Sequence, residues 1–183
     1  ARAFDGSRLH VDEPTVRVVA PASHGDAAAL RFTYRGDSET KAALASGQAR
    51  RQLGVKLRAA DGCNVVYVMW RLDPKPFVEV STKVNPGDRD HDDCGAGGYT
   101  KLKAARSEPP PPLRTGATHT LAAEIIGDEL TAHIDDKVVW RGRLPAAARA
   151  LAGPAGMRTD NVALDAELLV APIATRYAVP GCD

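Results

Sequence analysis

The chain has 183 residues, of which 44% are hydrophobic and 26% are charged, as in an ordinary globular protein. This length favours one domain spanning residues 1–183 over two. The formal net charge of +1 argues against general binding of nucleic acid, and no apolar run approaches the ~18 residues of a membrane span. Because the chain begins at Ala1 rather than Met, we expect either a processed form, such as one that has lost a secretory signal, or a fragment.

The first part of the chain predicts two strands and a variable connection. Leu9–Ala20 forms one expected strand that Pro14 interrupts, and Ala29–Arg35 alternates between apolar and polar side chains. Ser38–Gly47 favours either one or two helical turns or an irregular surface loop.

Alternation is strictest in three consecutive stretches, Leu53–Ala59, Val65–Leu72 and Val78–Val84. Together with their β-branched residues, this pattern is typical of strands with one face on a core. The expected inward face carries Leu53, Val55, Leu57, Val66, Val68, Trp70, Leu72, Val78, Val80 and Val84. The expected outward face carries Lys56, Arg58, Tyr67, Met69, Arg71, Glu79, Ser81 and Lys83.

The second and third stretches predict a hairpin around residues 73–77. The expected facing pairs are Tyr67 with Lys83, Arg71 with Glu79, and Arg58 of the first stretch with Tyr67. This register brings Cys63 and Cys94 to the same end of the hairpin, so we expect a disulfide between them. Closing a loop of about 30 residues would stabilise the fold by roughly 3–4 kcal/mol. Cys182 is then the odd cysteine; the alternative is three unpaired thiols in a cytosolic protein.

The rest of the chain predicts a loop, a proline-rich connection, further strands and a helix. Asn85–Gly98 is rich in Gly and Asp and reads as a long loop. The four prolines in Glu108–Pro112 predict a rigid crossover between two sheets, or alternatively a ligand for a proline-binding partner. The expected strands are Tyr99–Ala104, Thr120–Ile126, Glu129–Asp135, Val138–Gly142 and Val162–Val170, and the expected helix is Pro145–Ala152.

Many short strands with frequent turn signals predict an all-β fold. The architecture that fits best is a jelly-roll β-sandwich of two antiparallel sheets with one or two short helices. We expect Trp70 and Trp140 in its core. Arg158, Asp160 and Asn161 are expected to fix a loop through hydrogen bonds from their side chains to the backbone.

Four segments carry a family resemblance: Thr118–Leu121, Ile126–Glu129, His133–Lys137 and Gly153–Asn161. They read as a His-Thr-Leu strand, a Gly-Asp hairpin, an Asp-Asp turn and a stretch that leads into the last strand. In this order they resemble the concanavalin A-like lectin and glucanase superfamily, including its laminin G-like branch. The resemblance implies a double-sheet domain that binds or cleaves glycans, or binds proteins.

The enzymes of this fold carry motifs that the chain lacks. The hydrolase branch has a Glu-x-Asp-x-(x)-Glu run on one strand, whereas Glu124–Glu129 crosses a turn and cannot put its acids on one face. The jelly-roll alginate lyases have a Gln-x-His strand, which is absent here. Their other two motifs are represented only by Arg50–Leu53, with Gln52 in place of the acid, and by the fragment Gly98–Lys101.

The outward basic row is the main candidate ligand site. Arg binds carboxylate through paired donors and Tyr stacks on a sugar ring, so Lys56, Arg58, Tyr67, Arg71 and Lys83 suit an acidic sugar. Glu124 and His133 project from one sheet face, which could be the same surface, and form a candidate acid–base pair. The alternative is a solvated strand face on which Arg71 and Glu79 pair with each other.

An acidic loop offers the one candidate for a metal. Asp88, Asp90 and Asp92 have the alternate spacing of calcium loops, but Asp93 replaces the glycine and Tyr99 the final Glu of that motif. A solvated acidic loop is therefore favoured over a structural calcium site, and we expect no cofactor.

Two classes of function remain, with a third behind them. We favour a non-catalytic, lectin-like glycan-binding module, secreted or periplasmic, whose partner is a carbohydrate and in particular an acidic polysaccharide. The alternative is a lyase on uronate-containing polysaccharide that uses Tyr67 or Tyr99 with neutralising Lys and Arg. The third is a protein-binding laminin G-like module.

Overall fold

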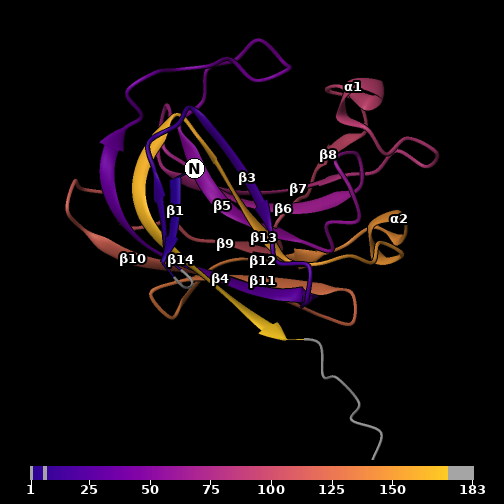
Figure 1. Cartoon of the computed structure of the whole chain (residues 1–183). Coiled ribbons are helices and arrows are strands. Elements are labelled where there is room, and N and C mark those ends of the chain that lie inside the picture. Colours follow the sequence, from indigo (N-terminus) through magenta and orange to yellow (C-terminus); the bar gives the residue numbers. More distant parts are fainter. Residues whose placement is uncertain (1, 6–7, 173–183) are drawn as a thin grey trace, which may run out of the picture.

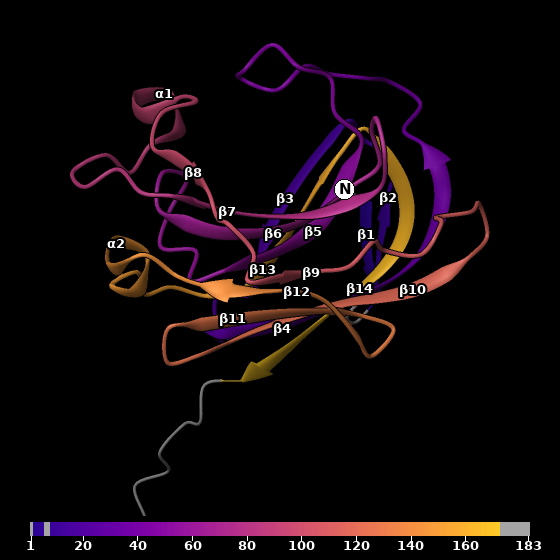
Figure 2. The same ribbon diagram turned by 180° about the vertical axis from the view of Figure 1, so that it is seen from behind.

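The computed structural model describes residues 2–5 and 8–172 and consists of two antiparallel sheets with two short helices (Figure 1). Sheet A contains, in spatial order, β1 (Arg2–Asp5), β2 (Arg8–Val11), β14 (Val162–Pro172), β4 (Ser23–Asp37), β10 (Thr118–Ile126), β11 (Glu129–Ile134), β12 (Lys137–Arg143) and β9 (Arg106–Ser107). Sheet B contains β3 (Thr15–Val19), β13 (Gly156–Asp160), β5 (Gln52–Leu57), β6 (Val65–Arg71), β7 (Phe77–Lys83) and β8 (Tyr99–Lys101). The helices are α1 (His91–Cys94) and α2 (Ala146–Arg149). The expected β-sandwich is confirmed, as Figure 2 shows from behind.

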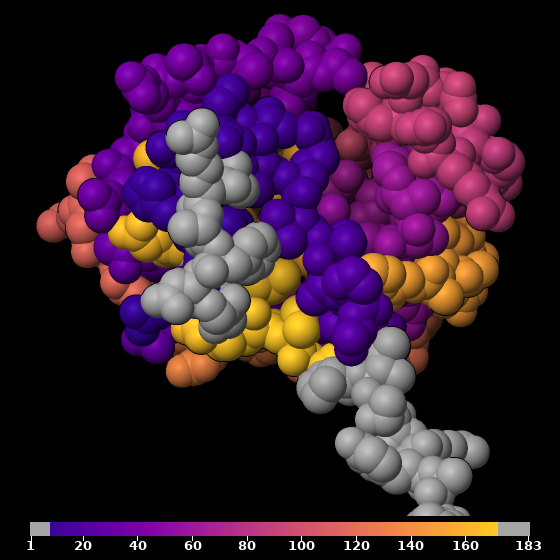
Figure 3. Space-filling view, viewed as in Figure 1, coloured from indigo at the N-terminus to yellow at the C-terminus, as the bar shows by residue number. Residues whose placement is uncertain are grey.

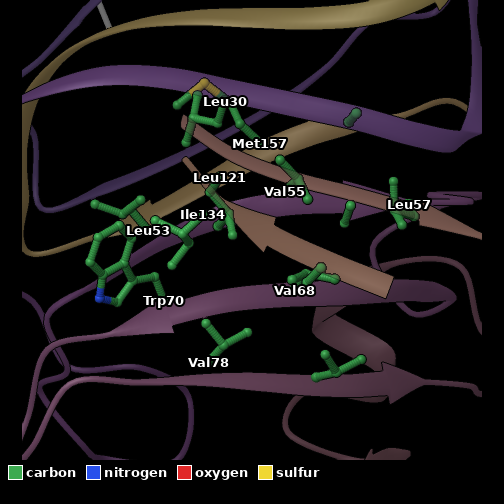
Figure 4. Close-up of a cluster of buried hydrophobic side chains, with 14 of the residues drawn as sticks. Leu30, Leu53, Val55, Leu57, Val68, Trp70, Val78, Leu121, Ile134 and Met157 are labelled. Atoms are coloured by element: carbon green, nitrogen blue, oxygen red, sulfur yellow. The ribbon is translucent and has the colours of Figure 1, made fainter. Parts of the chain in front are cut away.

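The core lies between the facing sides of the two sheets (Figure 4). Trp70 of β6 is fully buried and meets Phe32 of β4 edge-on, with 5.9 Å between the ring centroids. Trp140 is also buried, so the expectation for both tryptophans is confirmed. The apolar members of the alternating stretches in β5 to β7 supply the sheet B side of this core, each removing apolar surface from water.

Several connections differ from the expected ones. Leu9–Ala20 is two strands in different sheets, because the chain turns at Pro14 between β2 and β3. Ser38–Gly47 takes the irregular-loop alternative. The proline run links β9 to β10 within sheet A, so the predicted crossover between sheets was wrong; the chain changes sheets earlier, at residues 102–105. The expected short helix is present as α2.

The register of sheet B is shifted by two residues from the expected one. Tyr67 faces Ser81 rather than Lys83 on one side, and faces Lys56 rather than Arg58 on the other. The hairpin is tighter than expected because Phe77 already pairs with Arg71. A shift of two keeps every side chain on its face, so the outward parity still holds within the strands.

A disulfide joins Cys63 to Cys94, with their Cα atoms 5.9 Å apart, which confirms the expected pairing. It ties the 61–64 turn to α1 and the loop between β7 and β8. Cys182, the expected odd cysteine, lies outside the described residues. Within those residues, no helix is long and apolar enough to cross a membrane.

Replacing both bridged cysteines, Cys63→Ser with Cys94→Ser, should lower the free energy of unfolding by about 3–4 kcal/mol, because the unfolded chain regains the freedom of a loop of this length. Urea denaturation of the oxidised protein and of the variant measures the difference. Peptide mapping without reduction provides the control, and a Cys182 linkage to either cysteine would contradict the pairing.

Candidate functional site

A groove of about 200 Å³ lies on the outer face of sheet B, away from the core. Its floor comes from the strands of that sheet, and its walls are the 38–51 loop and the 84–98 loop that carries α1. Figure 3 shows the hollow between these two loops, purple at the top and pink at the right. The groove is lined by Arg17, Leu44, Ala45, Ser46, Arg50, Gln52, Tyr67, Met69, Glu79, Ser81, His91, Gly95, Ala96, Tyr99, Lys101 and Arg158.

The central strands of this floor are covered on both faces. Every residue of β5 is buried, and so is β6 from Val65 to Trp70. The outward row is therefore not the solvated strand face considered as an alternative. Its polar side chains lie in a partly dry environment, where pairing and hydrogen bonding decide which charges are stable.

One ion pair fixes the floor at the β13 side. Asp160 is fully buried, and both its oxygens accept from Arg158: Nε donates to Oδ2 at 2.8 Å and Nη2 to Oδ1 at 3.4 Å. Gln52 Nε2 donates to the same Oδ2 at 2.7 Å, and Arg17 Nη2 lies 3.9 Å from Oδ1. Burial alone would lower the pKa of Arg158, but Asp160, Tyr67 and Tyr99 together outweigh burial and the pKa is raised.

Two tyrosines lie beside this ion pair. The Tyr67 and Tyr99 rings stack with centroids 6.0 Å apart, and the Arg158 guanidinium sits 5.1 Å from the Tyr67 centroid. Arg158 Nη1 also donates to the Tyr99 hydroxyl at 3.4 Å. Burial, with Tyr99 nearby, raises the pKa of Tyr67 to about 12. Tyr67 is buried while Tyr99 is 42% exposed, so Tyr99 is the ring that a ligand can reach.

A second acidic centre lies at the β7 side of the floor. Glu79 accepts from Arg71 Nη1 at 3.2 Å, lies 2.9 Å from Lys101 Nζ, and has Arg50 Nη1 at 4.0 Å. The side chain of Lys101 is 66% exposed, whereas those of Arg71 and Glu79 are 12% exposed. The expected pairing of Arg71 with Glu79 is therefore present as a partly buried ion pair, and Lys101 is the accessible cation of this cluster.

Lys56 of β5 lies on the same outer face, beside the residues that line the groove, and is 9% exposed. Burial, together with the charges of Arg17 and Arg158, lowers its pKa to about 8. No described residue is recorded as an ion-pair or hydrogen-bond partner of its ammonium group.

Lys83 is placed under the 84–98 wall rather than in the groove. It is fully buried, and its Nζ donates to Gly95 O at 2.8 Å, Cys94 Sγ at 2.9 Å and Gly62 O at 3.2 Å. Burial lowers its pKa. These contacts make Lys83 a support for the wall, and no surface of it faces a ligand.

The opposite wall has its own anchors. Arg51 donates to both oxygens of Asp73, at 2.8 and 2.5 Å, and to Asp37 Oδ1 at 2.9 Å. Asn161 fixes the loop as expected: its side chain bonds the backbone of Ala42 in both directions and also donates to Arg50 O. Both walls are thus held by buried or half-buried polar contacts rather than by apolar packing alone.

Arg58 does not belong to this face, so its expected position was wrong. β5 ends at Leu57, and Arg58 has a φ of 47°, a left-handed conformation that turns its side chain out of the alternating pattern. Its Nε donates to Asp26 at 2.5 Å and its Nη1 to Arg149 O at 2.9 Å.

Glu124 and His133 lie on the other side of the sandwich. They belong to β10 and β11 of sheet A and line a shallow depression on its outer face with Ala27 and Leu169. The possibility that they share the basic face was therefore wrong, because the two sheets point their outer faces in opposite directions.

The acidic loop does not assemble as a metal site. Asp92 is in α1 and Asp90 immediately precedes this helix. The alternate aspartates therefore do not lie in an extended loop of the kind that wraps around a calcium ion. Within the described part of the chain, no group of three or more His, Cys, Asp or Glu side chains could hold a metal ion.

The sequence interpretation missed β13, which contributes Arg158 and Asp160. Both were expected to fix a loop through hydrogen bonds to its backbone, but they alternate with Met157 and Thr159 in a strand that pairs with β3 and β5. This short alternation was the available signal. Arg17, Gln52 and Lys101 were also missed, because nothing in their local sequence shows which strands become neighbours.

No protein-family model matches the chain, and no curated protein matches its sequence. Solved structures do match in fold. The carbohydrate-binding module CBM66 from Bacillus subtilis aligns with a TM-score of 0.60 at 15% identity, over 91% of this chain and 86% of that one. The Caenorhabditis elegans galectin LEC-6 has a TM-score of 0.50 at 10% identity, covering 92% and 99%. Xenopus laevis galectin-Ib has a TM-score of 0.50 at 14% identity, covering 84% and 100%. These likenesses confirm the expected resemblance to β-sandwich lectins at the level of the fold.

The buried ammonium of Lys56 predicts a pH-dependent stability. The folded-state pKa of about 8 lies below the usual 10.5, so between these values the unfolded chain holds more protons and stability rises with pH. We expect a rise of up to about 3 kcal/mol from this group between pH 8 and 10.5. In Lys56→Met this component should disappear, leaving the smaller rise from Lys83, whose pKa is also lowered.

Urea denaturation at pH 7, 8, 9 and 10 measures the effect. Lys137→Met, at an exposed lysine of sheet A, is the matched control and should keep the full rise. Equal slopes in wild type and Lys56→Met would contradict the buried, charged state of Lys56 at neutral pH.

Proposed function

We propose that the chain is a glycan-binding module that holds its ligand in the sheet B groove, with a preference for acidic polysaccharide. The observation that carries the proposal is that one aromatic ring and two cations of the groove are exposed to a ligand. Tyr99 is 42% exposed, the Arg17 side chain 43% and the Lys101 side chain 66%, and all three line one groove. An exposed ring with flanking cations can stack on a sugar and pair with its carboxylate or sulfate.

The fold likenesses support the same class of function. One aligned structure is described as a carbohydrate-binding module and two as galectins. Since these alignments are at 10 to 15% identity, the assignment to this chain rests on the groove and not on the relatives.

The lyase alternative is less well supported by the groove. A tyrosine that removes the proton next to a uronate carboxyl group must reach its phenolate form, and burial raises the pKa of Tyr67 to about 12. We therefore place binding before catalysis. The protein-binding alternative predicts that the chain binds none of the glycans in the experiment below.

We also propose a secreted or periplasmic location. The Cys63–Cys94 disulfide supports it, because disulfides persist in oxidising compartments.

A glycan array that spans neutral, uronic and sulfated saccharides tests the proposal. We expect binding to the anionic members, weakened by salt because exposed charges are screened within about 8–10 Å at physiological ionic strength. Arg17→Ala with Lys101→Ala should weaken this binding at least about tenfold, with little change in melting temperature, because both side chains are largely exposed.

Two controls place the site. Arg141→Ala with Arg143→Ala removes two exposed cations from β12 of sheet A and should leave binding unchanged. Arg58→Ala should also leave binding unchanged, since Arg58 lies with Asp26 outside the groove. Binding that survives loss of Arg17 and Lys101 but not of Arg141 and Arg143 would move the site to sheet A.

A further inference from the structure

The Lys56 side chain runs from β5 across β13 towards the β3 edge of sheet B. Lys56 pairs with Gly156 in the sheet, and a Cβ atom at position 156 would meet the Lys56 Cε at 3.0 Å. Any side chain at 156 would therefore take up the space in which the Lys56 chain lies. Beyond β13 comes β3, in which Val19 pairs with Gly156 and Arg17 with Arg158, so the Lys56 side chain is directed toward the strand that carries Arg17.

The other buried or partly buried charges of this face have partners. Arg158 is paired with Asp160, Arg71 with Glu79, and Lys83 with the backbone of the 84–98 wall. Lys56, at 9% exposure, has no recorded ion-pair or hydrogen-bond partner among residues 2–5 and 8–172. An unpaired charge at this depth is unfavourable, and it becomes favourable once an anion reaches it.

All charged groups that act on Lys56 have the same sign. Arg17 acts from β3 and Arg158 from β13, and the neighbour across β6 is the neutral Tyr67. Asp160, the nearest carboxylate of β13, is already occupied by Arg158 and Gln52. Lys56 therefore adds to the positive charge of Arg17 at the β3 end of the floor. Arg17 lies 3.9 Å from Asp160, and its half-exposed side chain leaves this end open to solvent.

We infer that Lys56 and Arg17 form an anion subsite that takes the carboxylate or sulfate of a bound saccharide. The inference rests on the proposed function, and it specifies where the carboxylate or sulfate of the saccharide binds. Arg158 and Arg71, which are already paired with Asp160 and Glu79, then shape the floor but do not form the ion pair with the ligand. The ligand class is a saccharide with a singly charged substituent near the end of the groove that Arg17 lines.

The subsite has a proton-linked signature. Because Lys56 loses its proton with a pKa near 8, the affinity for an anion should fall as pH rises through that value. By the same linkage, a bound anion should raise the pKa of Lys56. Arg17 and Arg158 keep their charge over this range, so they cannot produce the same profile.

The experiment compares trigalacturonate with its fully methyl-esterified form, which has the same sugars without the charges. Calorimetric titration from pH 6.5 to 9.5 should show wild-type affinity for trigalacturonate falling at least about tenfold across the range. Lys56→Met should lower the affinity at pH 6.5 by about tenfold or more and give a flat profile, with the ester unaffected. Lys137→Met is the control and should behave as wild type, and melting temperatures verify that each variant is folded.

The outcomes separate the subsite from the proposed function. If trigalacturonate binds but Lys56→Met is unchanged, or the wild-type profile is flat, the subsite is overturned and the groove remains. If no saccharide binds, the proposed function fails, and NMR titration of the Lys56 pKa with sodium sulfate and sodium acetate then decides the subsite. A raised pKa upholds it, with the more effective salt distinguishing sulfate from carboxylate recognition, and an unchanged pKa with both salts overturns it.

Discussion

The ion pair between Arg158 and Asp160 is the interaction on which the outer face of sheet B depends. Asp160 is fully buried, and a carboxylate at that depth is stable only with charged or hydrogen-bonding partners. Arg158 and Gln52 supply them from β13 and β5. The same pairing holds the guanidinium against Tyr67 and below the Tyr99 hydroxyl, so the central strands and the exposed ring are positioned by one buried contact.

Burial on this face is produced by the two walls, which are anchored by different means. The 84–98 wall is held covalently by Cys63–Cys94 and from below by Lys83, whose ammonium donates to two carbonyls and a disulfide sulfur. The 38–51 wall is held by Arg51 and Asn161. Lys83 also contacts the groove residues His91 and Tyr99 from below, and the walls keep the floor partly dry while Arg17, Tyr99 and Lys101 stay exposed.

Alternation predicts which side of a strand a residue faces, and here it was right for β5 to β7. It contains no information on register, because a shift of two residues preserves the parity that hydrophobic burial selects. Tyr67 therefore kept its face but changed its neighbours from Lys83 and Arg58 to Ser81 and Lys56. Arg58 was lost to the face because the strand ends one residue earlier in a left-handed turn. The placement of Glu124 and His133 depends on which strands share a sheet. The same holds for β13, which comes from the C-terminal part of the chain and lies between β3 and β5 from its N-terminal part. Such long-range pairing leaves no trace in local sequence patterns.

The charges of the groove divide into two groups with different physical roles. Arg158 and Lys83 are already paired and buried, and Arg71 is paired and partly buried, so a ligand that engaged them would first have to break an ion pair or a set of hydrogen bonds in a region of low polarity. Arg17 and Lys101 are exposed, so their contacts with Asp160 at 3.9 Å and Glu79 at 2.9 Å are screened by solvent and cost less to exchange for a ligand. Lys56 differs from both groups, because it is buried without a partner and has already lost much of its hydration through folding. An anion at Lys56 would therefore gain a pairing whose desolvation the fold has largely completed, and the cost of keeping that charge would appear as lower stability of the unbound protein. On this argument the proposed selectivity for acidic saccharides does not come from the number of cations on the face. It comes from Lys56, a cation that is only 9% exposed and has no ion-pair or hydrogen-bond partner among the described residues.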